Sequence, residues 1–211
     1  MSGSGGDFMT KIKICGLMQK EDIDCVNRIQ PDYCGFIVNF PKSRRSKTEE
    51  EVKILTSGLS DRILSVGVFV DEDPRTVIRM LREKTIGAAQ LHGNEDEDYI
   101  RMVQRESRRP VIRAFEIQTK EDVRKAERSP ADAILLDAGK GSGRSFNWSL
   151  LNGIKRNFFL AGGISPENLR QALQQVRPTA VDLSSGVETA GRKDAAKMEE
   201  AVRIVRQFSD G

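Results

Sequence analysis

Eight short apolar segments alternate with longer charged segments along this chain, and this alternation limits its fold more than any other feature. The apolar segments span residues 11–15, 33–39, 63–70, 88–93, 111–117, 133–137, 158–163 and 180–186. They are rich in Val, Ile, Leu and Phe, which is typical of parallel strands that are covered by helices. The sequence therefore predicts eight strands, each followed by a helix or a helical turn.

The segments between the predicted strands carry signals for helix starts. Thr48, Thr119 and Ser165 are predicted N-caps, and a proline follows Ser165 at the first helical position. The acidic residues and the proline of 71–74 predict another start, and the last helix is predicted over 193–208. The sixth connection is the shortest, because it allows only about a turn and a half of helix at 3.6 residues per turn.

Eight strand–helix units in 211 residues predict a single-domain (β/α)8 TIM barrel, a fold that needs roughly 200 residues or more. A doubly wound parallel sheet is the alternative, and the glycine-rich loops described below favour the barrel. The barrel domain is predicted to span residues 9–211. The opening MSGSGGDF, residues 1–8, is predicted to be a flexible tail or a remnant of an expression vector.

Charge and cysteine content exclude several classes of protein. The chain has 34 Lys and Arg against 31 Asp and Glu, well mixed, which argues against a nucleic-acid partner. No apolar run approaches the roughly 18 residues that a membrane span needs, so no membrane partner is expected. The three cysteines lie 10 and 9 residues apart and fit no zinc or redox motif, so we expect a cytoplasmic protein without a metal. Cys25 and Cys34 are interpreted as packing residues.

The residues that end each strand are the candidates for chemistry, because a TIM barrel has its active site at the carboxyl ends of its strands. Cys15 ends the first strand. Alternation places Lys13 and Cys15 on the inner face, and Ile12 and Ile14 against the helices. Cys15 is a candidate general base if nearby cations lower its pKa, and an inert core thiol otherwise. Lys13 would be a buried charge, with Asp182 as its structural partner.

Three more side chains lie where strands end. Asp137 ends the sixth strand and is either a partly desolvated general acid or a cap for the next loop. Arg45 closes the cationic segment 41–45 after the second strand, where a guanidinium can bind a carboxylate; a solvated loop is the alternative. His92, the only histidine, is expected to have at most a minor polar role in the site.

Small residues follow the sixth, seventh and eighth strands. Glycines let backbone N–H groups approach an anion closely, and the TIM barrel has its usual phosphate site near these loops. One such loop is weak evidence, but three in succession predict a phosphate-binding site. The predicted phosphate-binding residues are Gly141, Ser142, Gly143, Gly162, Gly163, Ser184, Ser185 and Gly186.

Taken together, the motifs resemble one family, the phosphoribosylanthranilate isomerases of tryptophan biosynthesis. Their order and spacing carry the resemblance, which runs from about residue 11 to residue 208. The motifs are KICG (13–16), GFIVNFPKSRR (35–45), VGVFV (66–70), QLHG (90–93), LLD (135–137), GSGRSFNW (141–148), LAGGISPEN (160–168), VDLSSGVE (181–188) and GRKD (191–194).

The resemblance implies a (β/α)8 barrel and a cofactor-free Amadori rearrangement. N-(5-phosphoribosyl)anthranilate would become 1-(2-carboxyphenylamino)-1-deoxyribulose 5-phosphate. Cys15 would be the general base, Asp137 the general acid and Arg45 the partner of the anthranilate carboxylate, while the glycine-rich loops would hold the phosphate. Activity would then rise as Cys15 ionises and fall as Asp137 loses its proton. The expected partner is a small phosphosugar, and both a monomer and a homodimer remain open.

The chain departs from the family pattern at three points. Asn147 stands where the family usually has aspartate, Ser46 where an aromatic residue is common, and the loop 137–141 is short. Two alternative functions also remain. One is another phosphosugar barrel, such as ribulose-phosphate 3-epimerase or a dual-specificity histidine/tryptophan isomerase. The other is a non-catalytic phosphosugar-binding barrel, because a fold alone does not fix a function.

Overall fold

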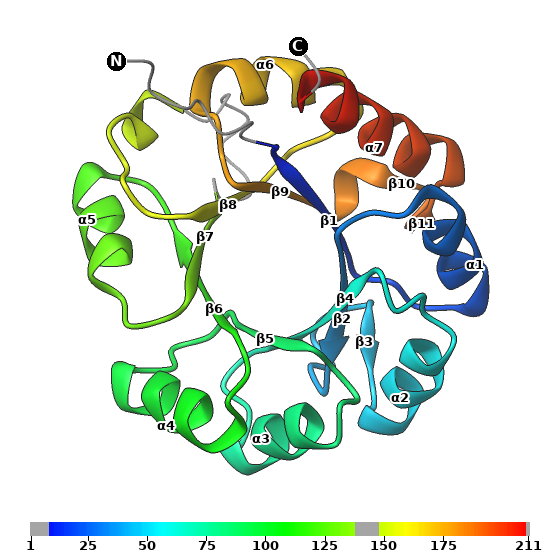
Figure 1. Cartoon of the computed structure of the whole chain (residues 1–211), viewed down its shortest axis with the longest axis vertical. Coiled ribbons are helices and arrows are strands. Elements are labelled where there is room, and N and C mark those ends of the chain that lie inside the picture. The colour runs from blue at the N-terminus through cyan, green and yellow to red at the C-terminus, as the bar shows by residue number, and fades with distance from the viewer. Residues whose placement is uncertain (1–8, 138–147, 210–211) are drawn as a thin grey trace, which may run out of the picture.

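Parallel strands form a closed ring with helices outside it (Figure 1). The computed structural model describes residues 9–137 and 148–209. Strands that follow one another pair in parallel, and β1 pairs with both β2 and β9, which closes the barrel. All eight predicted strands are confirmed within the described residues. They are β1 (Lys11–Cys15), β2 (Tyr33–Val38), β4 (Leu64–Phe69), β5 (Ala88–Leu91), β6 (Val111–Glu116), β7 (Ala133–Asp137), β8 (Phe158–Ala161) and β9 (Ala180–Leu183).

Four helices begin where the sequence predicts them, after Thr48, Thr119 and Ser165 and at the end of the segment 71–74. Thr48 and Thr119 accept hydrogen bonds from backbone N–H groups three residues on, at 3.2 and 3.3 Å. In the described part of the sixth connection, residues 148–157, the only helical element is the 3₁₀ turn η1 (Trp148–Leu151). The helices are α1 (Lys20–Ile29), α2 (Glu49–Ser57), α3 (Pro74–Arg82), α4 (Glu97–Ser107), α5 (Lys120–Arg128), α6 (Pro166–Val176) and α7 (Ala195–Ser209).

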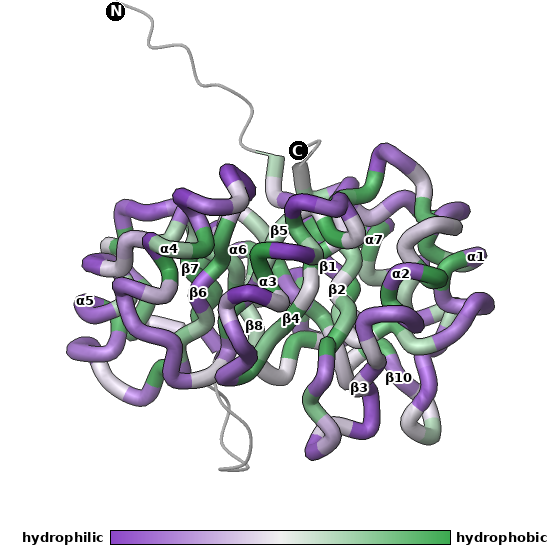
Figure 2. The backbone as a smooth tube through the Cα atoms, turned by 90° about the horizontal axis from the view of Figure 1, so that it is seen from below, coloured by the Kyte–Doolittle hydropathy of each residue, from purple (hydrophilic) through white to green (hydrophobic). Residues whose placement is uncertain are grey.

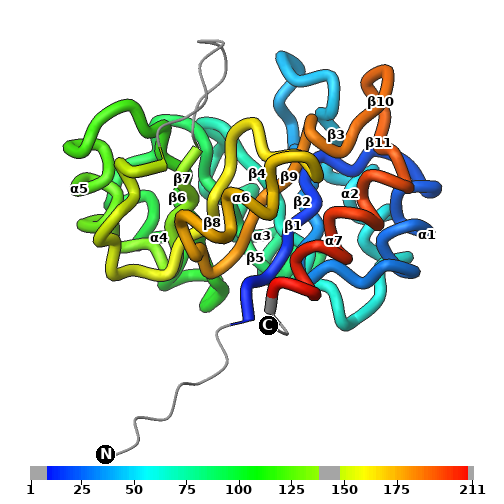
Figure 3. Tube along the Cα trace, turned by 90° about the horizontal axis from the view of Figure 1, so that it is seen from above, coloured from blue at the N-terminus to red at the C-terminus, as the bar shows by residue number. Residues whose placement is uncertain are grey.

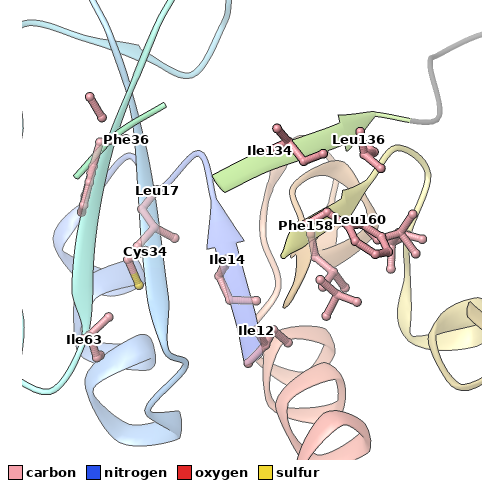
Figure 4. Close-up of a cluster of buried hydrophobic side chains, with 14 of the residues drawn as sticks. Ile12, Ile14, Leu17, Cys34, Phe36, Ile63, Ile134, Leu136, Phe158 and Leu160 are labelled. Atoms are coloured by element: carbon pink, nitrogen blue, oxygen red, sulfur yellow. The ribbon is translucent and has the colours of Figure 1, made fainter. Parts of the chain in front are cut away.

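The strands separate two apolar layers. Side chains such as Ile12, Ile14, Ile134 and Leu136 belong to the outer layer, between the strands and the helices (Figure 4). Intervening side chains such as Leu135 belong to the smaller cluster inside the barrel. The predicted alternation of the first strand is thus confirmed, and Cys15 lies on the inner side.

Two small elements extend the carboxyl end of the barrel, and the sequence analysis missed both. The short strand β3 (Ser46–Lys47) pairs with β2, and β10 (Glu188–Thr189) forms a hairpin with β11 (Arg192–Lys193). Positive φ angles at Ala190 and Gly191, 49° and 80°, fit a two-residue hairpin turn. Because β11 occupies 192–193, α7 starts at Ala195 rather than at 193.

The two added elements lie close together at one end of the barrel. Figure 2 and Figure 3 show β3 and β10 projecting side by side, at the end opposite the first described residues of β1. This is the end at which the strands finish and at which the sequence predicts the active site. Among the described residues, no helix is both long enough and apolar enough to cross a membrane.

Candidate active site

A cavity of about 1120 Å³ opens at the carboxyl ends of the strands. Its lining includes the predicted site residues Arg45, His92, Asp137 and Ser185, which come from four different loops and strand ends. Typical small-molecule pockets measure about 300–1,000 Å³, so the cavity is large enough for a metabolite. A second cavity of about 320 Å³ lies before β8 and β9 at the opposite end, and its lining contains none of the predicted site residues.

Cys15 ends β1 and is only 6% exposed, and it is not among the residues that line the cavity. Its sulfur faces Gly35 of β2, where an added Cβ would lie only 2.6 Å from Sγ, so glycine makes room for the thiol. Burial raises the pKa of Cys15, and Asp182 adds to this effect, while Lys13 and Lys193 oppose it. The expected cations are therefore present, but burial outweighs them and favours the protonated thiol in the free protein.

The predicted pair of Lys13 and Asp182 is confirmed. The two residues lie side by side on β1 and β9, and Lys13 Nζ is 2.8 Å from Asp182 Oδ2. The Lys13 side chain is fully buried and that of Asp182 is 8% exposed. Burial works to lower the pKa of Lys13, but the Asp182 carboxylate and Cys15 together raise it. The lysine is therefore charged inside the barrel, two residues before Cys15.

Asp137 and His92 lie next to each other in the lining of the cavity. His92 Nε2 lies 3.7 Å from Asp137 Oδ2, and His92 Nδ1 lies 3.0 Å from the side-chain amide nitrogen of Gln90. Burial lowers the pKa of His92 despite the nearby Asp137 carboxylate, so the imidazole is neutral at pH 7. The carboxyl group of Asp137 therefore lies beside an uncharged polar ring.

Arg45 lines the cavity but is tightly held by Glu188 of β10. Arg45 Nε and Nη2 donate to the two Glu188 carboxylate oxygens at 2.6 and 2.8 Å. Arg44 also pairs with Glu188, and Lys193 Nζ donates to it at 2.9 Å. A ligand carboxylate can still meet Arg45 through Nη1 and the second Nη2 hydrogen, because a guanidinium carries five N–H donors.

Glu188 is the centre of this cationic cluster, and the sequence analysis did not single it out. Burial tends to raise its pKa, but hydrogen bonds from Arg45 and Lys193 lower it to about 2. The carboxylate therefore stays ionised at any physiological pH. Its position directly after the predicted phosphate loop, in VDLSSGVE, was the one signal in the sequence that could have identified it.

The predicted phosphate loops after β8 and β9 pack directly against each other. Gly162 and Gly163 have φ angles of 88° and 66°, which favour glycine. A Cβ at Gly186 would lie 2.0 Å from the backbone oxygen of Ile164, so only glycine allows this close approach. Ser184 and Ser185 begin the second loop, and Ser185 lines the cavity.

Lys193 ties the second loop to the cationic cluster, because its Nζ donates to the Ser184 backbone oxygen at 2.9 Å. The third predicted loop, with Gly141, Ser142 and Gly143, lies outside the described residues, as does Asn147. No group of three or more His, Cys, Asp or Glu side chains in 9–137 and 148–209 could hold a metal ion.

Glu95 is a second buried carboxylate that was not predicted as a site residue, and it joins two loops of the cavity near His92. Glu95 accepts hydrogen bonds from the backbone N–H groups of Asp71 and Gly93, both at 2.9 Å. It also pairs with Arg113, whose Nη1 lies 3.3 Å from Glu95 Oε2. The loops after β4 and β5 are thereby joined. No local sequence pattern predicts this role of Glu95, because it depends on contacts between two loops.

Comparisons with known proteins agree on one family. The model of the N-(5′-phosphoribosyl)anthranilate (PRA) isomerase family matches residues 12–203. A relative of that name from Endomicrobium trichonymphae is 41% identical over 205 residues, covering 95% of this chain and all of the relative.

Solved structures give the same result. A phosphoribosyl anthranilate isomerase in complex with reduced 1-(o-carboxyphenylamino)-1-deoxyribulose 5-phosphate superposes with a TM-score of 0.84 at 33% identity, covering 94% of this chain and 100% of that one. A structure from Thermotoga maritima, described as mutually generated monomers of a dimeric phosphoribosylanthranilate isomerase, has a TM-score of 0.83 at 33% identity and the same coverage.

Proposed function

The chain belongs to the phosphoribosylanthranilate isomerase family, and from this premise we propose that Cys15 and Asp137 are its general base and general acid. The protein is an isomerase of tryptophan biosynthesis that converts N-(5-phosphoribosyl)anthranilate into 1-(2-carboxyphenylamino)-1-deoxyribulose 5-phosphate. The observation that supports the proposed site most strongly is the cavity of about 1120 Å³ lined by Arg45, His92, Asp137 and Ser185, which opens at the end of the barrel where β1 finishes in Cys15.

The first step requires an acid. Opening of the ribose ring breaks the bond between C1′ and the ring oxygen, while the anilino nitrogen lone pair forms a Schiff base with C1′. Protonated Asp137 donates its proton to the departing ring oxygen. The carboxyl group is suited to this step because it lies at the cavity wall beside His92, which is neutral at pH 7.

The second step requires a base. The Cys15 thiolate removes the proton from C2′, and the electrons of that bond neutralise the iminium nitrogen to give an enolamine. The enolamine then tautomerises to the aminoketose, with a proton returning to C1′. β9 and β8 lie between β1 and β7 in the sheet order, so Cys15 and Asp137 approach the substrate from different sides.

The two anionic ends of the substrate would fix the reacting carbons between the catalytic groups. We assign the phosphate to the loops formed by Gly162, Gly163, Ser184, Ser185 and Gly186, with 141–143 as a further proposed contributor. Backbone N–H groups and the N-terminus of α6 are suited to a phosphate there. Anchoring both ends holds the reacting carbons in place, which can supply a large part of a rate enhancement.

We assign the anthranilate carboxylate to Arg45, and this assignment gives a sharp binding test. Two stable ligands are compared, the reduced product analogue and the same molecule without its aromatic carboxyl group. Wild type is expected to bind the carboxylated ligand at least about tenfold more tightly, since a charge-assisted hydrogen bond contributes about 1.5–3 kcal/mol. Arg45→Met is expected to abolish this preference while binding the ligand without the carboxyl group as wild type does.

Isothermal titration calorimetry measures both affinities. Lys47→Met is the matched control, because it removes a nearby cation whose partner is the partly exposed Glu51. Equal losses of both ligands in Arg45→Met would contradict the assignment, since they would indicate general damage to the cavity.

The pH dependence of kcat/KM tests the proposed base. Burial raises the pKa of Cys15 above its ordinary value of 9.0, and the active form is the thiolate. The kcat/KM of wild type is therefore expected to rise with pH through a midpoint above 9.0, because this parameter reports the free enzyme. The residual activity of Cys15→Ser should lack this limb. A rising limb that persists unchanged in Cys15→Ser would assign the titration to another group.

The substrate is a small molecule, which we propose is recognised as a phosphosugar. We also propose that the protein acts in the cytoplasm. Cys15, Cys25 and Cys34 form no disulfide among the described residues, which fits that compartment. Both a monomer and a homodimer remain compatible with the described residues, and light scattering coupled to size-exclusion chromatography distinguishes them.

A further inference from the structure

The buried pair of Lys13 and Asp182 has no part in the proposed reaction, yet it lies inside the barrel directly below Cys15. The two side chains are joined by the 2.8 Å hydrogen bond from Lys13 Nζ to Asp182 Oδ2. The second carboxylate oxygen, Asp182 Oδ1, is buried without a hydrogen-bond partner among the described residues. A buried ion pair is rarely more stabilising than an apolar pair of similar size. Stability alone therefore does not account for this pair.

The geometry of β1 brings the charge of Lys13 to the thiol. Residues two apart on a strand point to the same face and are separated by about 6.6 Å along it. Lys13 and Cys15 both face the barrel interior, and both are almost completely buried. Charges interact strongly over such a distance inside a protein, because little water screens them. Asp182 lies beside Lys13 in register, so its negative charge acts on the same thiol.

We propose that Lys13 and Asp182 form a tuning pair that sets how readily Cys15 ionises, with Lys13 favouring the thiolate and Asp182 limiting that effect. The proposal rests on the proposed function in one respect, namely that the ionised thiol of Cys15 is the general base. Lys13 and Asp182 do not need to touch the substrate in this role. They act through Cys15, because their charges change how readily its thiol ionises.

Other charged or titratable groups also face Cys15 or its neighbours. Lys193 and Arg45 approach from the rim, and both pair with Glu188, whose carboxylate offsets their charge. Lys193 of β11, Arg45 after β2 and Cys34 of β2 interact electrostatically with Cys15, and His92 after β5 interacts with Lys13 and Asp182. The charge of Lys13, in contrast, is offset only by Asp182 among the described carboxylates within salt-bridge distance. Changing either member of the tuning pair therefore changes the field at Cys15 most directly.

The test measures ionisation of Cys15 without using turnover. The rate of alkylation by iodoacetamide is followed against pH, and the midpoint of the profile reports formation of the thiolate. Trypsin places the three cysteines on separate peptides, because Lys or Arg lies between each of them, so mass spectrometry quantifies Cys15 alone. The variants are Lys13→Met, Asp182→Asn and the double variant. Lys11→Met is the control, since it removes an exposed cation from the same strand.

The proposal predicts opposite shifts from the two single variants. Lys13→Met should move the midpoint to higher pH, by one unit or more, so that the thiolate fraction at a fixed lower pH falls at least about tenfold. Asp182→Asn should move it to lower pH, the double variant should fall between them, and Lys11→Met should match wild type. A purely structural pair would change the melting temperature without these opposite shifts.

Two results would overturn the proposal: an unchanged midpoint in folded Lys13→Met, or an Asp182→Asn midpoint at or above that of wild type. If Lys13→Met does not fold, as judged by circular dichroism, Asp182→Asn and the double variant decide the question. The measurement needs no substrate. A failure of the proposed function would therefore appear as absent turnover, with the alkylation midpoints still measurable.

Discussion

Replacement of Cys15 by serine is expected to lower kcat by a factor of at least about 10², and Asp137→Asn should do the same, because each change removes a general base or acid. A serine hydroxyl is far less acidic than a thiol and does not ionise to a useful extent at working pH. An asparagine amide can donate a hydrogen bond but is not acidic enough to transfer a proton to the ring oxygen. Neither change alters the volume of the side chain by much. The KM should therefore change less than kcat.

Two matched controls separate chemistry from damage to the fold. Cys25→Ser changes the thiol on α1, and Asp24→Asn changes an exposed carboxylate of the same helix that pairs with Lys20. Both should retain wild-type kcat. A loss in the controls as large as that in Cys15→Ser and Asp137→Asn would show that the assay reports stability rather than catalysis.

Replacement of Lys13 by methionine is expected to lower the free energy of unfolding by about 3–5 kcal/mol. The change leaves the Asp182 carboxylate in the barrel interior without its partner, and an uncompensated buried charge is expensive. A typical domain has only about 5–15 kcal/mol in total, so the variant should be close to unfolding. Urea denaturation measures the effect as a shift of the midpoint.

The double variant Lys13→Met/Asp182→Leu distinguishes loss of charge pairing from loss of packing. It should recover most of the lost stability, because no charge remains in the interior and the two apolar side chains fill similar space. A double variant that is no more stable than Lys13→Met would contradict this explanation. The Cys15 midpoint of the recovered protein should lie below that of Lys13→Met if the tuning pair acts as proposed.

The strands and several caps could be predicted because they depend on local sequence. Apolar runs such as 133–137 and caps such as Thr48 carry their own signals, and tertiary packing did not override them. The pairing of Lys13 with Asp182 could also be predicted, because a closed barrel of eight units makes the first and last strands neighbours. Alternation then places both side chains inside.

The rim of the site could not be predicted in the same way. Arg45 and Glu188 are 143 positions apart in the sequence, one in a loop and the other in a hairpin. The periodicity of strand residues predicts neither of these two segments. The sequence therefore indicated a free guanidinium for a carboxylate, whereas Glu188 occupies one edge of it. The pKa of Cys15 shows the same limit. The cations could be anticipated from the motif, but the extent of burial that outweighs them is a property of the packed barrel.

The most direct test of the proposed site measures turnover and binding in the same protein preparations. N-(5-phosphoribosyl)anthranilate is generated in the assay, and binding of the reduced product analogue is titrated for wild type, Cys15→Ser and Asp137→Asn. Wild type is expected to turn over the substrate, and both variants are expected to bind the analogue nearly as tightly while their turnover falls at least about 10²-fold. Wild-type turnover in both variants would contradict the proposed site and place the chemistry on other residues.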